Sequence, residues 1–447
     1  MNTFAEFDGG HPWFGRHQLR PAAPAGTIQR MLRHELRDTG WPYQPIMPAA
    51  PMTIPRSSYA ELFRVSVALL ELVHRTALES AEETRQRLRV YRMPATEDRL
   101  WMRDAWLEER YADSVARPDV VIGPDGPQFL EFNVSGAIGG VVETQSRLET
   151  WRRLHGDGLY TSPSPFAVRA GMFRTIGADL DVAPRVAIVG SARVAGVESR
   201  YFELEAEHYN SHGLTARFFE PEDLHEAWDV APHLRYPIGL RDFTIADWLD
   251  AGLDTGAVQE AVDHGCLLVG TQTSAFLHHK LTLGRLSEGR PWMSAADRRL
   301  VDRYVPWTRI LADRKTDRDG RPIDLLPFVL ARREHLVLKA GIGESGLQVV
   351  LGRDTTSTDW EAAVRTAAAE ETSIVQDFVE PGTCRVPLVI DDDADPRDVD
   401  VAPVLGPLLF GRRPAGLFCR FYGDGSTGII SVRGRIPSSD NVAVAIR

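Results

Sequence analysis

Residues 119–143 read DVVIGPDGPQFLEFNVSGAIGGVVE, in which two apolar runs (120–122 and 129–130) flank a Pro-Asp-Gly turn. This pattern predicts a β-hairpin. Asp119 opens the first strand, while Glu131 and Asn133 stand two apart on the second and therefore project from one face. Two carboxylates and an amide oxygen form a hard-oxygen cluster of the type that Mg²⁺ accepts when it also holds substrate phosphates. Taken alone, the hairpin is equally consistent with solvated polar groups on a strand end.

The composition is that of an ordinary soluble globular protein. The 447 residues are 43% hydrophobic and 25% charged, and this length allows two or three domains. No apolar run approaches the ~20 residues needed to cross a bilayer, and the first residues lack the basic segment and apolar core of a secretory signal. Three widely spaced cysteines, Cys266, Cys384 and Cys419, argue against a disulfide framework and a cysteine metal site. We therefore expect a cytoplasmic protein that does not associate with membranes.

The charge balance excludes one class of partner and singles out two side chains. A net charge of −11 and a pI near 5.7 leave no basic excess to neutralise phosphates, so general nucleic-acid binding is not expected. Of the 51 basic residues only three are lysines: Lys280, Lys315 and Lys339. Where arginine is the default cation, a retained lysine indicates a site that needs a compact charge on a flexible stem. Lys315 lies in a charged loop, which leaves Lys280 and Lys339 as candidates.

Helical and strand patterns alternate along the chain. Residues 1–55 are rich in Pro and Gly and are expected to wrap over the surface, and helical spacing follows over 57–92 and 100–111. Between residues 185 and 275, buried strands (RVAIVG, LTARFFEP, CLLVG) alternate with an amphipathic helix, which predicts a parallel sheet with right-handed crossovers. VGSARVAG lacks the glycine spacing of a dinucleotide fingerprint. Arg241 and Asp242 follow an apolar run here; they either contact substrate at a domain crevice or form an ion-paired loop.

Residues 335–352, HLVLKAGIGESGLQVVLG, predict a strand, a glycine-bearing loop and a second strand. Glycines at 341, 343 and 346 would let the backbone close over a polyphosphate beside Lys339, although an ordinary glycine-rich turn explains the loop equally well. The Walker pattern is absent. Residues 372–382, TSIVQDFVEPG, predict a buried strand whose backbone can face an adenine edge, and residues 407–435 predict further strands, with Arg420 at the end of one.

In their order along the chain, these motifs resemble a circularly permuted ATP-grasp ligase, specifically the synthetase domain of glutathionylspermidine synthase. In the ordinary family the metal-binding E-x-N strand follows the glycine-rich loop, whereas residues 131–133 precede Lys339 by about two hundred residues. The resemblance implies an α/β fold with α+β elements: a permuted ATP-grasp fold with an inserted Rossmann-like parallel-sheet domain. The implied segments are an N-terminal wrap and helical region (1–95), the first ATP-grasp part with the metal-binding hairpin (96–154), the Rossmann-like substrate domain (155–275) and the second ATP-grasp part (276–447).

The resemblance also implies residue roles. RPDVVIGPDGPQFLEFN resembles the family's R-x-D followed by E-x-N, which places Arg117 on the reacting acyl group and gives the Mg²⁺ ligands Asp119, Glu131 and Asn133. SAFLHHKLTLGRL resembles N-K-x-x-L-P, LVLKAGIGESG resembles K-P-x-x-x-R-E-G, and IVQDFV resembles the adenine-hinge strand. RRPAGLFCR resembles G-x-x-x-R, which puts Arg420 near the phosphates or a substrate carboxylate. The implied nucleotide-binding residues are Lys280, Lys339, Gly341, Gly343, Ser345, Gly346, Gln376, Phe378 and Val379.

The chemistry implied by the resemblance is ATP-dependent amide formation. A carboxylate attacks the γ-phosphorus of ATP to give an acyl phosphate and ADP, and an amine then displaces phosphate. The implied cofactors are ATP and Mg²⁺, and the implied partners are a small-molecule carboxylate and an amine, with small amino acids or a peptide expected. Two alternatives stay open: a small-molecule kinase that uses the same ATP site without an amine acceptor, and a nucleotide-binding protein that has lost catalysis. A homodimer is the default expectation for the oligomeric state.

Overall fold

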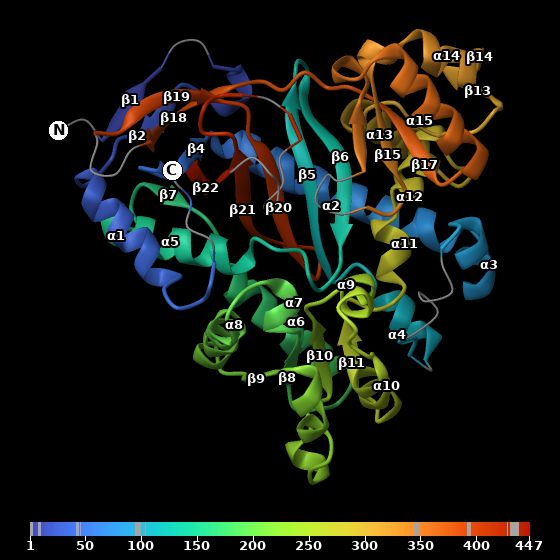
Figure 1. Cartoon of the computed structure of the whole chain (residues 1–447). Coiled ribbons are helices and arrows are strands. Elements are labelled where there is room, and N and C mark those ends of the chain that lie inside the picture. Colours follow the sequence, from blue (N-terminus) through green and yellow to red (C-terminus); the bar gives the residue numbers. More distant parts are fainter. Residues whose placement is uncertain are drawn as a thin grey trace.

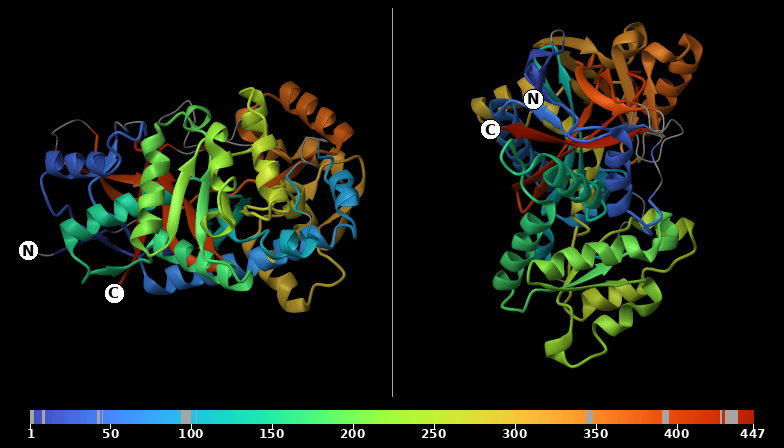
Figure 2. Two further views of the ribbon diagram at one scale, coloured as in Figure 1. Left: turned by 90° about the horizontal axis from the view of Figure 1, so that it is seen from below. Right: turned by 90° about the vertical axis from the view of Figure 1, so that its left-hand side faces the viewer.

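The computed structural model describes residues 3–7, 10–41, 44, 46–93, 100–102, 104–343, 348–390, 395–426, 428–429 and 438–447. They form a mixed α/β protein with a large central sheet, a parallel-sheet unit below it and a smaller antiparallel-sheet unit at its upper right (Figure 1). The right-hand view of Figure 2 shows the parallel-sheet unit as a separate lower lobe. None of the helices in the described ranges combines the length and the apolar character that a bilayer span requires.

The large sheet contains the predicted hairpin. Its strand order is β4-β22-β21-β20-β5-β6, and β7 also pairs with β22. β4 runs parallel to β22, and the other neighbours are antiparallel. The strands are β4 (Met52–Ile54), β5 (Val115–Gly123), β6 (Gly126–Val134), β7 (Tyr160–Thr161), β20 (Val404–Phe410), β21 (Arg413–Phe421) and β22 (Ser439–Ile446). The β5–β6 hairpin and the strands expected over 407–435 are thus confirmed, the latter as far as the described residues extend.

Helices cover both faces of the large sheet. Ala443 of β22 packs in the same apolar cluster as α2, whereas its neighbour Val442 packs with α5. Strands buried on both sides read as continuous apolar runs, which is the pattern seen in β20 and β21. The helices are α2 (Arg56–Leu78) on one face, α5 (Val141–His155) and α6 (Pro165–Asp179) on the other, and α11 (Ser274–His278), α12 (Lys280–Glu288) and α13 (Ala295–Tyr304) against α2 and the edge strand β6.

The parallel-sheet unit has the order β11-β10-β8-β9, with every neighbouring pair parallel. This confirms the parallel sheet expected between residues 185 and 275. Its strands are β8 (Arg185–Val189), β9 (Thr215–Phe219), β10 (Ile238–Arg241) and β11 (Leu267–Val269). Its helices are α7 (Ala192–Ala195), α8 (Ser199–Ser211), α9 (Ile245–Asp250) and α10 (Gly256–Asp263), with 3₁₀ turns at Pro221–Ala227 and Pro232–Leu234.

The antiparallel-sheet unit has the order β12-β17-β15-β16. β15 and β16 form the strand pair expected on either side of the glycine-bearing loop, with Lys339 opposite Val349. The strands are β12 (Thr308–Ile310), β15 (Leu336–Ala340), β16 (Val349–Leu351) and β17 (Ser373–Asp377). The unit also contains α14 (Leu325–Ala331), α15 (Ser357–Glu370) and the hairpin β13 (Lys315–Arg318) to β14 (Arg321–Asp324).

The N-terminal region is more deeply integrated than the expected surface wrap. β4 lies within the large sheet, and buried Ile28 and Leu32 of α1 pack in the same cluster as α5. Short apolar segments inside a Pro- and Gly-rich stretch carry too little periodicity to indicate this burial. The remaining strands and α-helices are β1 (Phe4–Glu6) paired with β2 (His17–Leu19), α1 (Ala25–Glu35), the sheet β19 (Arg397–Val401)-β18 (Cys384–Val389)-β3 (Met47–Pro48), and the helices α3 (Thr84–Val90) and α4 (Ala105–Arg110).

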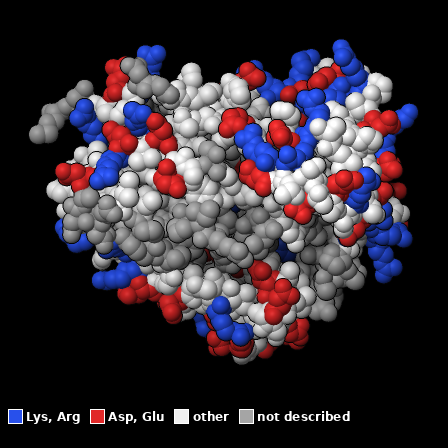
Figure 3. Space-filling view, turned by 45° about the horizontal axis from the view of Figure 1, so that its top comes forward, with Lys and Arg blue, Asp and Glu red and all other residues white. Residues whose placement is uncertain are grey.

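Charges on the surface are mixed. On the face in Figure 3, the acidic and basic side chains of the described residues are interspersed over the molecule. Exposed ion pairs occur on the protein surface, such as that of Arg200 with Glu207 on α8. Pairs of this kind contribute roughly 0–1 kcal/mol each to stability.

A buried ion pair, in contrast, fastens the parallel-sheet unit to the large sheet. Arg169 of α6 donates from Nη1 to Glu205 Oε1 of α8 at 2.8 Å, and both side chains are 2% exposed. Arg169 Nη2 also donates to the Gly136 carbonyl at 3.2 Å. Because α6 packs on β21, this contact joins two layers of the protein.

Replacing Arg169 by Met should lower the free energy of unfolding by about 3–5 kcal/mol, because Glu205 would keep an uncompensated buried charge. Urea unfolding monitors the change. The double variant Arg169→Met/Glu205→Met should recover part of the loss, since both charges are then removed. Arg200→Met, which removes an exposed ion pair on α8, is the matched control, and a loss no greater than that of Arg200→Met would contradict the prediction.

Candidate active site

The hairpin places four polar side chains on one face as two directly opposed pairs. Arg117 lies opposite Asn133, and Asp119 lies opposite Glu131. The alternate residues of β5, such as Ala116, turn to the other face and pack in the cluster that contains α2. Asn133 Nδ2 donates to Asp119 Oδ1 at 3.3 Å and to the Arg117 carbonyl at 3.0 Å. The side chains that the period-2 alternation of the sequence predicted to share a face therefore lie together in the structure.

A β-bulge at Leu130 links this hairpin to the antiparallel-sheet unit. The register passes from Asp119 opposite Glu131 to Val120 opposite Phe129, so Leu130 has no paired residue on β5. Its carbonyl accepts from Lys339 Nζ at 3.3 Å and from Gln376 Nε2 at 3.4 Å.

Gln376 holds the Lys339 side chain in place. Lys339 Nζ donates to Gln376 Oε1 at 2.7 Å, and Gln376 Nε2 donates to Thr308 Oγ1 at 3.0 Å. Gln376 is buried and belongs to β17, next to β15 in the sheet. Sequence reasoning assigned Gln376 to nucleotide binding, and the geometry gives it a more specific role, because its amide orients the ammonium group of Lys339.

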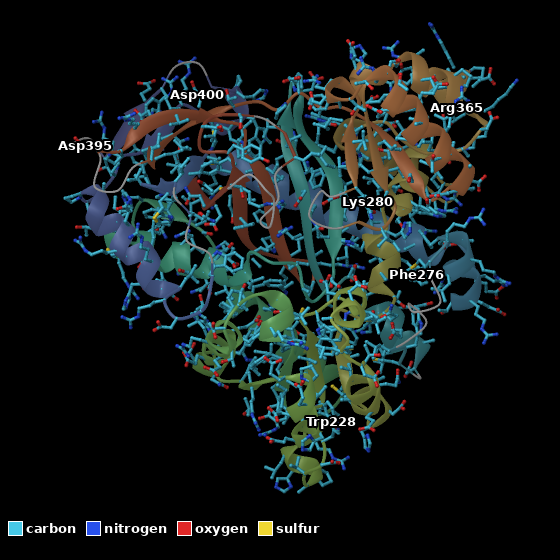
Figure 4. All side chains as sticks on the ribbon, in the orientation of Figure 1. Trp228, Phe276, Lys280, Arg365, Asp395 and Asp400 are labelled. Atoms are coloured by element: carbon cyan, nitrogen blue, oxygen red, sulfur yellow. The ribbon has the colours of Figure 1, made fainter. Side chains whose placement is uncertain are left out.

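Cations surround the two carboxylates. Arg420 Nη2 donates to Asp119 Oδ2 at 2.6 Å, and Arg117 Nη2 lies 3.6 Å from Asp119 Oδ1. Lys280 Nζ lies 3.4 Å from Glu131 Oε2. Figure 4 labels Lys280, which lies between β6 and the antiparallel-sheet unit.

The cluster has more positive than negative groups. Lys339, Lys280 and the two arginines outnumber Asp119 and Glu131, so the local field favours a polyanion. Lys280 Nζ also donates to the Gly343 carbonyl at 2.9 Å, which ties the glycine-bearing loop to this charge cluster.

Burial and the neighbouring charges shift the pKa values of Glu131, Lys339 and Arg117. Burial would raise the pKa of Glu131, but the ammonium groups of Lys280 and Lys339 outweigh burial and lower it to about 2. Burial lowers the pKa of Lys339 to about 8, with Glu131 opposing that shift. Burial, followed by the neighbouring Arg420, lowers the pKa of Arg117 to about 10. These groups are therefore all charged at neutral pH.

A single cavity of about 490 Å³ contains the cluster and reaches the parallel-sheet unit. Most of the residues expected at the site from the sequence line it, namely Arg117, Asp119, Glu131, Asn133, Lys280, Lys339, Gly343, Gln376, Phe378, Val379 and Arg420. Phe378 lies just beyond the end of β17. The guanidinium of Arg353 covers its ring, with Arg353 Cζ 3.7 Å from the ring centroid. Arg241, the last residue of β10, and Asp242 also line the cavity, so both lie beside the site.

Gly341 departs from its expected role. Its N–H donates to the Thr372 carbonyl at 2.8 Å, and its carbonyl accepts from Lys280 N at 2.9 Å. Both backbone groups are thus engaged within the protein, and Gly341 shapes the loop instead of presenting a donor to phosphate. Ser345 and Gly346 lie outside the described residues.

Sequence reasoning missed His278, which lines the cavity two residues before Lys280. Burial, followed by the neighbouring Lys280, lowers its pKa to about 4, so the imidazole is neutral at pH 7. Its Nδ1 has no hydrogen-bond partner among the described residues. The only signal in the sequence was its proximity to Lys280, and this does not distinguish it from His279.

Oxygen donors at this site fit Mg²⁺ by their chemistry. Asp119, Glu131 and Asn133 offer carboxylate and amide oxygens from adjacent strands, and Mg²⁺ binds through a few such ligands while keeping water or phosphate oxygens. Within the described ranges, no group of three or more His, Cys, Asp or Glu side chains is placed to hold a metal ion. An ion here would therefore depend on the amide and on ligands that a substrate brings.

Comparison with solved structures identifies the fold. The chain is similar to the structure of a glutathione synthetase-like effector from Globodera pallida, with a TM-score of 0.58 and 13% sequence identity. The similarity covers 96% of this chain and 98% of that one. No family model and no curated protein sequence matches the chain. At this identity the likeness establishes a glutathione synthetase-like fold and nothing finer.

Replacing Glu131 by Gln should make stability less sensitive to acid. The folded-state pKa of Glu131 is lowered from 4.5 to about 2, so its charged form stabilises the protein above pH 4.5 and this contribution is lost as pH falls towards about 2. The wild type should be more stable than the variant at neutral pH, and the difference should shrink through this window. Urea unfolding at several pH values measures it.

Glu334→Gln is the control for this experiment, because the Glu334 side chain is 71% exposed and borders no cation cluster of the cavity. Its stability should follow that of the wild type at every pH. Parallel wild-type and Glu131→Gln curves between about pH 5 and pH 3 would contradict the assigned ionisation of Glu131.

Proposed function

We propose that the protein is an ATP-dependent carboxylate–amine ligase that releases ADP and phosphate, built on a circularly permuted ATP-grasp fold. The observation that carries the proposal is the cluster of four cations around Asp119 and Glu131 inside one cavity. A glutathione synthetase-like fold supports it, since that fold is shared with a protein named for an amide-forming ligase. The segments 1–95, 96–154, 155–275 and 276–447 are retained as the proposed domain division.

The nucleotide would lie against the antiparallel-sheet unit. Lys280 and Lys339 would hold the polyphosphate, and Gln376 would keep the Lys339 ammonium directed towards it. Phe378 and Val379, which follow β17 and line the cavity, would contact the base. Asp119, Glu131 and Asn133 would hold Mg²⁺, whose role is to neutralise charge on the phosphate oxygens.

The residues of the chain account for charge development in both steps. In the first, a substrate carboxylate oxygen bonds to the γ-phosphorus while the bond to ADP breaks. In the second, the amine nitrogen bonds to the acyl carbon, loses a proton and expels phosphate. Arg117 and Arg420 lie beside Asp119 and would stabilise the negative charge that grows on the transferred group and on the tetrahedral oxygen.

Product formation tests the proposal directly. ADP and phosphate release should be measured with Mg²⁺ and ATP against amino acids and small peptides, singly and in pairs, with mass spectrometry of the products. ADP release that requires an acid and an amine, together with a product lighter than their sum by one water, supports the ligase. ADP release with one substrate and a stable phosphorylated product would favour a kinase. Absence of ATP binding would refute the assignment of the site.

Replacing Arg117 by Met should reduce kcat by ~10²–10³, because a donor to developing negative charge is removed from a buried site. Arg117→Lys should recover only part of the rate, since a lysine cannot reproduce the guanidinium fork. Steady-state kinetics of ADP release measure both variants.

Replacing Lys339 by Met should weaken ATP binding, because the variant removes one of the two ammonium groups proposed to hold the polyphosphate. Calorimetric titration with Mg²⁺ and ATP measures the loss. Lys315→Met is the matched control: Lys315 is exposed on β13 and lies outside the cavity, so its loss should leave ATP affinity unchanged. Equal affinities for the Lys339→Met and Lys315→Met variants would contradict the assignment.

A further inference from the structure

The cavity continues beyond the charge cluster into an apolar region that the proposed chemistry leaves unexplained. Side chains of the parallel-sheet unit, together with Trp41, line this region, which we call the aromatic arm. Its principal residues are Trp41, Val194, Tyr201, Phe202, Phe243 and Trp248. The arm belongs to the same cavity as Arg117 and Asp119.

The position of the arm follows from the topology of the parallel sheet. β9 and β10 lie on opposite sides of β8, so the strand order reverses between β8 and β10. Ligands of open α/β sheets bind at the carboxyl ends of the strands, at such a reversal. Ser191 and Arg241, at the carboxyl ends of β8 and β10, both line the cavity.

A close backbone contact joins this edge to the hairpin. A Cβ atom at Gly136 would lie 1.8 Å from the Arg241 carbonyl oxygen, so only glycine allows the loop after β6 to approach β10 this closely. The same loop then carries Gly139, whose carbonyl accepts from Arg117 Nη1 at 3.2 Å, and the apolar Ile138. Ile138 and Val142, at the start of α5, both line the cavity. Apolar surface therefore extends from the Arg117 guanidinium to the arm.

The cations beside the arm already make contacts within the protein. Arg169 is paired with Glu205, and Arg241 donates to Gln272 Oε1 at 3.0 Å and to Ser274 Oγ at 3.4 Å. Because both guanidinium groups already donate hydrogen bonds within the protein, an apolar occupant would leave those contacts intact. Two further acidic side chains, Asp242 and Asp247, also line this part of the cavity.

Stacked rings give the arm a defined shape. Trp41 and Tyr201 stack with centroids 5.6 Å apart, and Phe243 and Trp248 stack with centroids 3.7 Å apart. Rigid aromatic walls of this kind favour apolar groups of matching size, because binding needs little further ordering of the protein.

We propose that the aromatic arm binds the side chain of the carboxylate substrate, and that this substrate is an amino acid or peptide bearing a bulky aliphatic or aromatic side chain. The inference rests on the proposed ligase function and specifies the acid. Arg117 marks the position of the reacting carboxylate, and the apolar surface leading from it reaches the arm. The amine substrate is left without such a constraint.

Two measurements on the full chain test the proposal. Calorimetric titration with L-leucine, L-phenylalanine, L-alanine, L-serine and L-aspartate, in the presence of Mg²⁺ and ATP, measures affinity without requiring turnover. ADP release with each acid and a common panel of amines measures kcat/KM. Because each methylene in an apolar pocket is worth roughly tenfold or more, leucine and phenylalanine should exceed alanine and serine by at least about tenfold in both assays.

A variant that fills the arm distinguishes this site from general apolar binding. Val194 is half-buried on α7 and lines the arm, so Val194→Phe should reduce the affinity for leucine and phenylalanine by about tenfold or more while changing that for alanine much less. Val182→Phe is the matched control, because Val182 is exposed and lies outside the cavity. ATP affinity should be the same in both variants and in the wild type.

The outcomes separate the two proposals. Preferred turnover of serine or aspartate, or an apolar preference that Val194→Phe leaves intact, would overturn the assignment of the arm while the ligase stands. Apolar binding that is sensitive to Val194→Phe, without ADP and amide formation from any pair, would support the arm and overturn the ligase. Absence of both apolar binding and turnover would overturn both.

Discussion

The direct cross-strand pairing of Asp119 with Glu131 is the constraint on which the rest of the structure depends. Two carboxylates opposite one another on neighbouring strands repel, and the pairing persists only if cations compensate them. The compensating cations come from different parts of the fold: arginines from β5 and β21, and lysines from the start of α12 and from β15. These polar contacts therefore help to hold the antiparallel-sheet unit against the large sheet.

The four cationic side chains outnumber the two carboxylates, and this excess of positive charge destabilises the folded protein. Burial, and to a smaller extent the like charge of Lys280, lower the pKa of Lys339 to about 8. A ligand with several negative charges would offset the excess of positive charge, so a polyanion should stabilise the folded protein through binding. The bulge at Leu130 leaves its carbonyl free to accept hydrogen bonds from both Lys339 Nζ and Gln376 Nε2. Together with the bond from Lys339 to Gln376, these contacts orient the lysine before any ligand binds.

Local pattern determined which parts of this structure the sequence could predict. The hairpin, the strands beside the glycine-bearing loop and the parallel sheet follow from turn chemistry and strand periodicity, which act over a few residues. The placement of β4 beside β22 does not, because a three-residue strand with two apolar side chains does not indicate a partner at the far end of the chain. The bulge was also unpredictable, since Phe129 and Leu130 read as one apolar run. Gly341 showed the limit of motif reasoning: glycine spacing does not reveal that both backbone groups are used internally.

The aromatic arm could not be predicted from local sequence patterns either. Its residues Trp41, Tyr201 and Trp248 come from separate segments, and each by itself is typical of a core residue. Its separation from the charge cluster has a consequence for specificity. The groups proposed to handle phosphate lie on the large sheet and the antiparallel-sheet unit, whereas the arm lies almost wholly on the parallel-sheet unit. Substitutions in the arm can change the volume and polarity offered to a substrate without altering the balance of cations around Asp119 and Glu131. The fold thus allows the substrate to vary while the charge arrangement, which tolerates little change, stays fixed.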